Sequence, residues 1–216
     1  MTHRYLPAPS PEDLGLVPSG EGALRRSGNA LPKLKRFRFQ LMHEWIRQEF
    51  PKCRVADVGG GKGLLAYLLI RDGFDATVID PVRQSLPRKF RDLTGRRVGI
   101  PPDADVPRIA RPYSLETGRK FDLLIAMHAH GVNMSILDTV ARMGTSCVLM
   151  PCCVIDEPET PPRDDAWFDW LVRHATDQGL KVDYFYLNFK GQNVGFYIRG
   201  PLSAVKASGH NESRNR

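Results

Sequence analysis

The sequence predicts an α/β domain built on a mostly parallel sheet with helices on both faces. Short apolar runs alternate with stretches of helical periodicity, and a glycine-dense turn joins the first run to a leucine-rich helix. Near the end, two alternating segments flank the turn Lys190-Gly-Gln-Asn193. Alternating strands and helices favour a parallel sheet, whereas two alternating segments around a short turn predict an antiparallel hairpin.

The first expected element is a helix from Lys33 to about Phe50, because Leu34, Phe37 and Leu41 recur at helical spacing. The remaining expected elements are strands over 55–58, 76–80, 121–127 and 147–150, helices over 64–71, 135–143 and 164–178, and a hairpin of 181–189 with 194–199. A basic helix is also predicted over 83–95, although Pro87 lies within it, and strand three is either 97–100 or 108–111. The sheet would then have seven strands, one of them reversed.

The chain of 216 residues is long enough for one such domain with a full core. Residues 1–32 are rich in Pro, Gly and Ser, and we expect a flexible basic arm there. The folded domain is predicted to cover 33–202, and a disordered tail is predicted over 203–216. No internal repeat is apparent.

The formal net charge of +7 is unevenly distributed. Residues 1–38 contribute +4 and 203–216 contribute +2, and within the body the stretch 83–111 carries eight basic and three acidic residues. Positive charge of this kind attracts polyanions without carrying sequence information. RNA bound through the arm and the 83–111 region is therefore a candidate partner, although a charged tail that only aids solubility explains the arm equally well.

No apolar run approaches the length of a membrane span, and the N-terminus lacks the apolar core of a secretory signal. The four cysteines show no spacing typical of a disulfide framework. These features predict a cytoplasmic protein without a membrane partner. They do not indicate an oligomeric state.

The glycine-dense turn is the strongest functional signal. Glycines allow positive φ angles and close approach of the backbone to a ligand, and the acid that ends the next strand, Asp80, can accept from ribose hydroxyls. A dinucleotide fingerprint would need glycine where Leu64 stands, and a phosphate-binding loop would need Ser or Thr at Gly63. The pattern that remains is G-x-G-x-G, formed by Gly59, Gly61 and Gly63, with Asp57 just upstream.

This motif resembles the first motif of class I S-adenosylmethionine-dependent methyltransferases. The resemblance implies a Rossmann-like class I methyltransferase fold and S-adenosylmethionine as the cofactor, with Asp57 beneath its methionine part. The cofactor-binding residues that it implies are Asp57, Gly59, Gly60, Gly61, Lys62, Gly63, Asp80, Pro81, Met127 and His128.

Further polar residues follow the predicted fourth and fifth strands. Ligands of open α/β sheets bind beyond the carboxyl ends of the strands, so these side chains should gather around the reacting end of the cofactor. A histidine there can accept a proton from a hydroxyl or amine nucleophile near neutral pH. His128 is the first candidate for this role, His130 the second, and Asn133 a further catalytic candidate.

Three of these segments together resemble a narrower group of methyltransferases. A Gly-Lys-Gly loop, a histidine turn after strand four and the Pro-Cys-Cys that ends in Cys153 are similar to tRNA 2′-O-methyltransferase-like domains. Those domains have cysteine where this chain has His130. The resemblance implies an RNA acceptor, either tRNA or rRNA.

Several alternatives stay open at this point. Histidines with Cys152 and Cys153 could form a zinc site, but adjacent side chains can diverge, so no metal is expected. The cysteines can also be small buried hydrophobes, or supply a thiolate that adds to a pyrimidine carbon. The acceptor can be a small molecule, with 155–163 as a lid, or the domain can be a non-catalytic scaffold. The aromatic side chains of Tyr113, Trp167 and Trp170 are interpreted as core rather than as base-stacking groups.

Overall fold

The computed structural model describes residues 34–162 and 165–200. The predicted arm and tail lie outside these residues. A seven-stranded sheet has the order β5-β2-β1-β6-β7-β9-β8, in which only β9 runs against its neighbours. The strands are β1 (Arg54–Val58), β2 (Asp75–Ile79), β5 (Arg108–Ile109), β6 (Leu123–Met127), β7 (Ser146–Met150), β8 (Asp183–Tyr186) and β9 (Val194–Ile198). The predicted parallel sheet with one reversed strand is confirmed.

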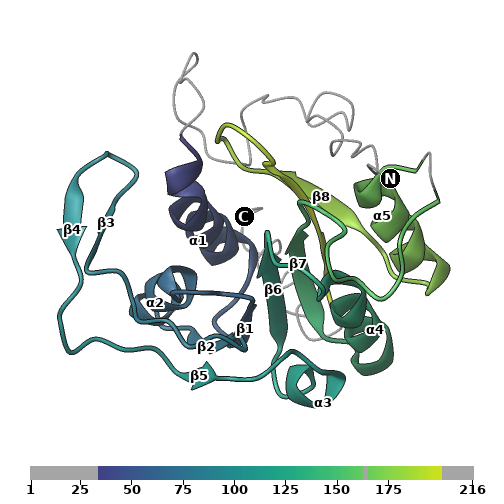
Figure 1. The fold of residues 1–216 in the computed structure, drawn as a ribbon, viewed down its shortest axis with the longest axis horizontal. Coiled ribbons are helices and arrows are strands. Elements are labelled where there is room, and N and C mark those ends of the chain that lie inside the picture. Colours follow the sequence, from purple (N-terminus) through teal and green to yellow (C-terminus); the bar gives the residue numbers. More distant parts are fainter. Residues whose placement is uncertain (1–33, 163–164, 201–216) are drawn as a thin grey trace, which may run out of the picture.

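Helices cover both faces of this sheet (Figure 1). One apolar cluster joins α1 and α2 to one face, and a second joins α4 and α5 to the other. The helices are α1 (Arg38–Glu49, after a 3₁₀ turn at Lys35–Phe37), α2 (Leu64–Arg71), α3 (Leu115–Gly118), α4 (Asn133–Met143) and α5 (Trp167–Asp177). None of the helices within the described residues combines the length and apolar character that a membrane span requires.

The central strands β6 and β7 are buried along their whole length, which explains their continuous apolar sequences. Of the three aromatic residues expected in the core, Trp167 is buried in the apolar cluster beneath α4 and α5, whereas Tyr113 and Trp170 are partly buried and pack against it. Trp167 is buried and stacks on Trp170, while the Tyr113 hydroxyl donates to Thr139 Oγ1 over 2.9 Å. These rings therefore stabilise the face covered by α4 and α5.

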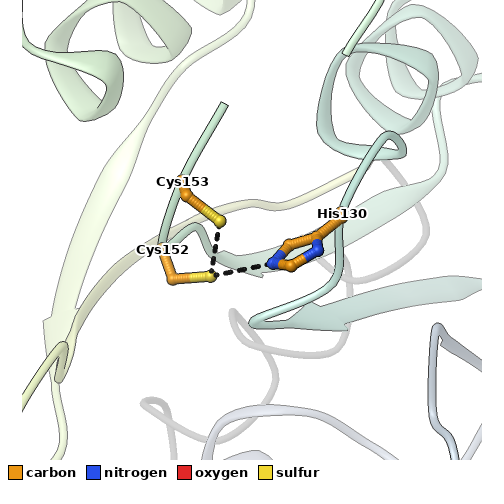
Figure 2. Close-up of side chains that lie close together, drawn as sticks. All are labelled: His130, Cys152 and Cys153. Carbon is orange, nitrogen blue, oxygen red and sulfur yellow. Dashed lines mark hydrogen bonds between the residues drawn. The ribbon is translucent and has the colours of Figure 1, made fainter. Parts of the chain in front are cut away.

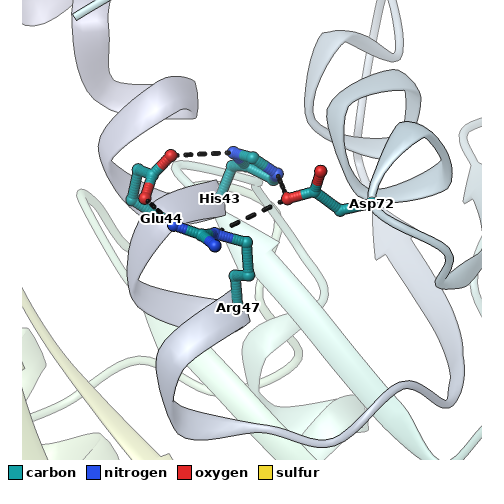
Figure 3. Close-up of polar contacts among 4 residues, drawn as sticks. All are labelled: His43, Glu44, Arg47 and Asp72. Carbon is teal, nitrogen blue, oxygen red and sulfur yellow. Dashed lines mark hydrogen bonds and ion pairs between the residues drawn. The ribbon is translucent and has the colours of Figure 1, made fainter.

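A small polar network holds α1 against the end of α2 (Figure 3). His43 Nε2 lies 2.9 Å from Asp72 Oδ2, and Arg47 bridges Asp72 and Glu44. Burial lowers the pKa of His43 even though both carboxylates oppose that change. The network holds α1 in place, and the N-terminal residues of this helix line the same groove as Lys62 of the glycine turn.

The predicted basic helix over 83–95 is wrong. Residues 89–99 instead form a separate hairpin of β3 (Lys89–Arg91) and β4 (Arg97–Gly99). Asp92 Oδ1 accepts from the backbone N–H groups of Thr94 and Arg96, and Gly95 has φ +89°. An aspartate that bonds the backbone two residues on, followed by a glycine with positive φ, forms a turn rather than a helix.

This hairpin stands beside α1 and away from the main sheet (Figure 1). Gln40 on α1 donates from Nε2 to the Arg91 carbonyl over 2.6 Å, which ties the two elements together. Of the two alternatives for strand three, 108–111 is right, because Arg108–Ile109 pairs in parallel with β2. The other segment, 97–100, belongs to the hairpin.

Candidate functional site

The carboxyl ends of four neighbouring strands bring the predicted site residues to one edge of the sheet. Strand β1 leads into the glycine turn and β2 into Asp80, whereas β6 leads into His128 and β7 into Cys152. Strand β6 lies between β1 and β7, with Met127 paired to Met150. The sequence predicted this arrangement for strands one, four and five, which correspond to β1, β6 and β7.

The glycine turn has a backbone that other residues cannot adopt easily. Gly59, Gly61 and Gly63 all have positive φ, at +67°, +52° and +79°. A Cβ at Gly59 would stand 2.6 Å from the Ala129 Cβ, so the turn packs directly on the segment after β6. At Gly59, glycine is therefore required both by its backbone conformation and by the space available.

Asp57 lies beneath this turn and is 2% exposed. It accepts a hydrogen bond from the Ala66 backbone N–H, but its Oδ2 has no partner among the described residues. A Cβ at Gly60 would overlap that oxygen, which shows that Oδ2 points at the turn. Burial raises the pKa of Asp57 to about 7, against smaller opposing effects of the hydrogen bond from Ala66 and of the Arg108 charge.

Asp80 connects β2 to the glycine turn. Its Oδ2 accepts from the Gly61 N–H over 2.9 Å, and its Oδ1 accepts from the Val82 N–H over 2.8 Å, with Pro81 between. A carboxylate has about four lone-pair sites, so each oxygen can accept a further bond from a ligand hydroxyl. Asp80 therefore stabilises the glycine turn, a role additional to the ligand contact that the sequence predicts for it.

Arg108 on β5 is a site residue that sequence reasoning missed. Its guanidinium donates to the carbonyls of Gly61 and Lys62, both over 2.8 Å. A Cβ at Gly63 would stand 2.8 Å from Arg108 Nη2, so the side chain lies tightly against the turn. The only sequence signal for this role was an arginine at the start of a candidate third strand. That signal does not identify its partners, because they lie more than forty residues away in the sequence.

His128 follows β6 in a strained conformation, with φ +54°. Its backbone N–H donates to the Met150 carbonyl over 3.0 Å, while both ring nitrogens are buried and have no partner among the described residues. Burial, followed by the nearby charges of Lys35 and Arg38, lowers the pKa of His128 to about 4. The ring is therefore neutral at physiological pH, with one nitrogen that can donate a hydrogen bond and one that can accept.

His130, Cys152 and Cys153 form a second polar group at the same edge (Figure 2). The two sulfur atoms lie 3.3 Å apart, and Cys152 Sγ lies 3.7 Å from His130 Nε2. The adjacent thiols thus converge. Burial and the neighbouring Cys153 thiol raise the pKa of Cys152 to about 12, so this environment does not favour a reactive thiolate.

Asn133 is buried at the start of α4, where its Nδ2 donates to Glu157 Oε1 over 2.6 Å. Glu157 also accepts from the backbone N–H groups of Val132, Asn133 and Met134. The carboxylate therefore caps α4, a favourable place for negative charge. Asn133 helps to hold this cap, while its Oδ1 has no partner among the described residues.

The Glu157 cap leads to a stability prediction. Replacing Glu157 with alanine should destabilise the protein by about 2–3 kcal/mol, because several buried donors lose a charged acceptor. The matched control is the exposed Glu159, whose replacement with alanine should change stability by less than about 0.5 kcal/mol. Urea unfolding of both variants measures the difference, and equal effects would contradict a capping role.

A basic groove of about 420 Å³ opens beside the glycine turn. Its walls come from the N-terminal part of α1, the β3–β4 hairpin, and Lys62 with Leu64. No acidic residue lines it, and none of its basic side chains forms an ion pair within the described residues. The basic residues are Arg36, Arg38, Lys62, Lys89, Arg91 and Arg97.

No protein-family model matches the chain, and no curated protein matches it. Solved structures that match include a ribosomal protein L11 methylase from Lactobacillus delbrueckii subsp. bulgaricus, with 14% identity and a TM-score of 0.47 over 74% of this chain and 76% of that one. DesVI from Streptomyces venezuelae matches with 16% identity and a TM-score of 0.47, over 76% and 91% of the two chains.

Human N-acetylserotonin methyltransferase, solved in complex with S-adenosylmethionine, matches with 14% identity and a TM-score of 0.44, over 77% of this chain and 52% of that one. Because the identities are this low and the TM-scores are below 0.5, the case for a methyltransferase site comes from the residues of the chain itself.

Proposed function

We propose that the protein is an S-adenosylmethionine-dependent methyltransferase that acts on RNA. The observation that carries the first part is the Asp57 carboxylate, whose buried Oδ2 lacks a partner among the described residues and lies directly beneath the glycine turn. A buried, unpartnered carboxylate oxygen is costly unless a ligand completes it. S-adenosylmethionine has an ammonium group that suits this oxygen, ribose hydroxyls that suit Asp80, and a sulfonium that supplies an electrophilic methyl group.

The chain's own contribution to the chemistry is alignment. Methyl transfer from a sulfonium needs a nucleophile held in line, and little acid–base assistance. The neutral ring of His128 has two hydrogen-bonding nitrogens with no protein partner in the described part of the chain. We propose that the ring orients a hydroxyl or amine of the acceptor, and that the bond from the His128 N–H to the Met150 carbonyl helps to hold the strained backbone of this residue at the strand end.

The basic groove supports RNA as the acceptor. It is adjacent to the glycine turn through Lys62, and Arg38 belongs to the groove while its charge also lowers the pKa of His128. Phosphates bound in the groove would therefore lie near the reacting end of the site. A small-molecule acceptor under a lid of 155–163 is less well supported, because Glu157 in that segment is bonded to the start of α4.

Calorimetry with S-adenosylmethionine tests the cofactor site. Replacing Asp80 with alanine should weaken binding by about tenfold or more, since bonds to a charged group contribute about 1.5–3 kcal/mol. The matched control is Asp122→Ala at the amino end of the sheet, where Asp122 pairs with Arg54. Binding that is unchanged by both substitutions, or absent from the folded wild type, would overturn the cofactor assignment.

Transfer of a labelled methyl group tests the acceptor. The wild-type protein is incubated with labelled S-adenosylmethionine and either total RNA or an RNA-free extract of small metabolites. Label in RNA that ribonuclease removes supports the proposal. Label only in the small-molecule fraction would exclude RNA while leaving the cofactor assignment intact.

A further inference from the structure

His130, Cys152 and Cys153 have the geometry of an incomplete metal site. Their ligand atoms all lie within 4.8 Å of one another, with separations of 3.3 Å between the sulfurs and 3.7 Å from Cys152 Sγ to His130 Nε2. Zinc bonds of about 2.3 Å to sulfur and about 2.0 Å to nitrogen, arranged tetrahedrally, need separations of about 3.8 Å and about 3.5 Å. The distance between the two sulfurs and the distance from Cys152 Sγ to His130 Nε2 are within about half an ångström of these values, and Cys153 Sγ lies within 4.8 Å of the histidine ligand atom.

The two segments that carry these ligands are held together by the backbone. They leave β6 and β7 at the paired residues Met127 and Met150, and the His128 N–H bonds the Met150 carbonyl. Gly131, next to His130, has φ +66° and packs so closely on Asp156 that a Cβ there would stand 2.8 Å from its carbonyl oxygen. The ligand positions therefore depend on the sheet and on a fixed turn, not on flexible side chains alone.

The cysteines lie in an irregular segment just after β7, which allows both thiols to turn to the same side. In a regular strand, adjacent side chains would point to opposite faces. Two sulfurs and an imidazole are the ligands that zinc prefers in proteins. Zinc binding releases the thiol protons, and the two resulting thiolates with a neutral histidine would balance the charge of the divalent ion.

We propose that His130, Cys152 and Cys153 bind one zinc ion with three protein ligands and one open position. His130 is exposed, so the open position is accessible to water or to an oxygen or nitrogen of an acceptor. Three protein ligands with an open fourth position are typical of zinc sites that act on a bound molecule. His130 then acts as a ligand and not as the general base considered from the sequence. The site does not depend on the methyl-transfer proposal.

Metal analysis of the full-length protein tests this inference. After purification with zinc and removal of excess metal, the wild type should retain roughly one zinc per chain. Zinc affinity should fall by at least about tenfold in each of the variants Cys152→Ser, Cys153→Ser and His130→Ala. A loss of about tenfold is already expected when a residue that only hydrogen-bonds to a metal ligand is replaced. Cys53→Ser is the control, because Cys53 precedes β1 at the opposite end of the sheet.

Two further measurements distinguish the alternatives. Cobalt substituted for zinc should give the absorption of a thiolate-bound tetrahedral ion in the wild type and in Cys53→Ser, but not in Cys152→Ser. Titration of thiols in the denatured, unreduced protein should count all four cysteines. A wild type that binds no zinc, that retains copper instead, or that has two thiols missing because Cys152 and Cys153 form a disulfide would overturn the proposal.

Discussion

Replacing Asp57 with asparagine should stabilise the ligand-free protein at high pH and weaken S-adenosylmethionine binding. The pKa of the buried carboxyl is raised from 3.8 to about 7, so between these values the unfolded chain has lost a proton that the folded protein keeps. Stability therefore falls as pH rises through this window, by an amount on the order of a few kcal/mol, and remains low above it. Asparagine removes this cost because it does not ionise.

The same substitution removes the negative charge proposed to receive the cofactor's ammonium group. Binding measured by calorimetry at pH 8 should weaken by about tenfold or more, even though the protein is more stable. Urea unfolding at pH 5 and pH 8 should show that the advantage of Asp57→Asn over the wild type grows with pH. A variant that gains stability without losing affinity would show that Asp57 does not contact the cofactor.

Asp122→Asn is a control with the opposite sign. The Arg54 side chain lowers the pKa of Asp122, so the stability that this carboxylate contributes is present at neutral pH and is lost as pH falls. Its replacement should therefore cost stability at pH 8 and leave cofactor affinity unchanged. Opposite pH dependences of stability would distinguish the buried, unpartnered carboxylate of Asp57 from the ion-paired carboxylate of Asp122.

Replacing the basic side chains on the hairpin side of the groove with acidic ones should weaken RNA binding strongly. The triple variant Lys89→Glu, Arg91→Glu and Arg97→Glu places three negative charges among the remaining groove arginines. Phosphate contacts dominate nucleic-acid affinity, and removing several is expected to lower it by about 100-fold or more. All three side chains are exposed on the hairpin, so the main core is untouched.

The measurement is fluorescence anisotropy of a labelled RNA over a range of salt concentrations. Alanine at the same three positions should reduce the slope of log affinity against log salt by about 0.7 for each phosphate of a single strand that the variant no longer neutralises. The matched control replaces Lys120, Arg142 and Lys190 with glutamate. These side chains are exposed outside the groove, and their replacement changes the net charge by the same amount. Equal reductions in affinity in both triple variants would indicate that total charge, and not the groove, attracts RNA.

Much of the fold follows from local sequence. Helix α2 has the predicted bounds Leu64–Arg71, and the strands that end at the site lie within one or two residues of their predicted positions. Apolar periodicity and glycine conformation are properties of neighbouring residues, so they can be recognised without tertiary information. The failed prediction, a helix over 83–95, overlooked the Asp92 turn, which is also a local signal.

The sequence by itself determined the order of the elements, the glycine turn, and the gathering of Asp57, Asp80 and His128 at one edge, because parallel strands bring their carboxyl ends together. Only the tertiary structure decided that Arg108 clamps the turn, that Glu157 caps α4 through Asn133, and that the two thiols meet His130. These contacts join residues more than twenty positions apart. Side-chain direction across such distances is set by packing in the folded chain, and no local pattern encodes it.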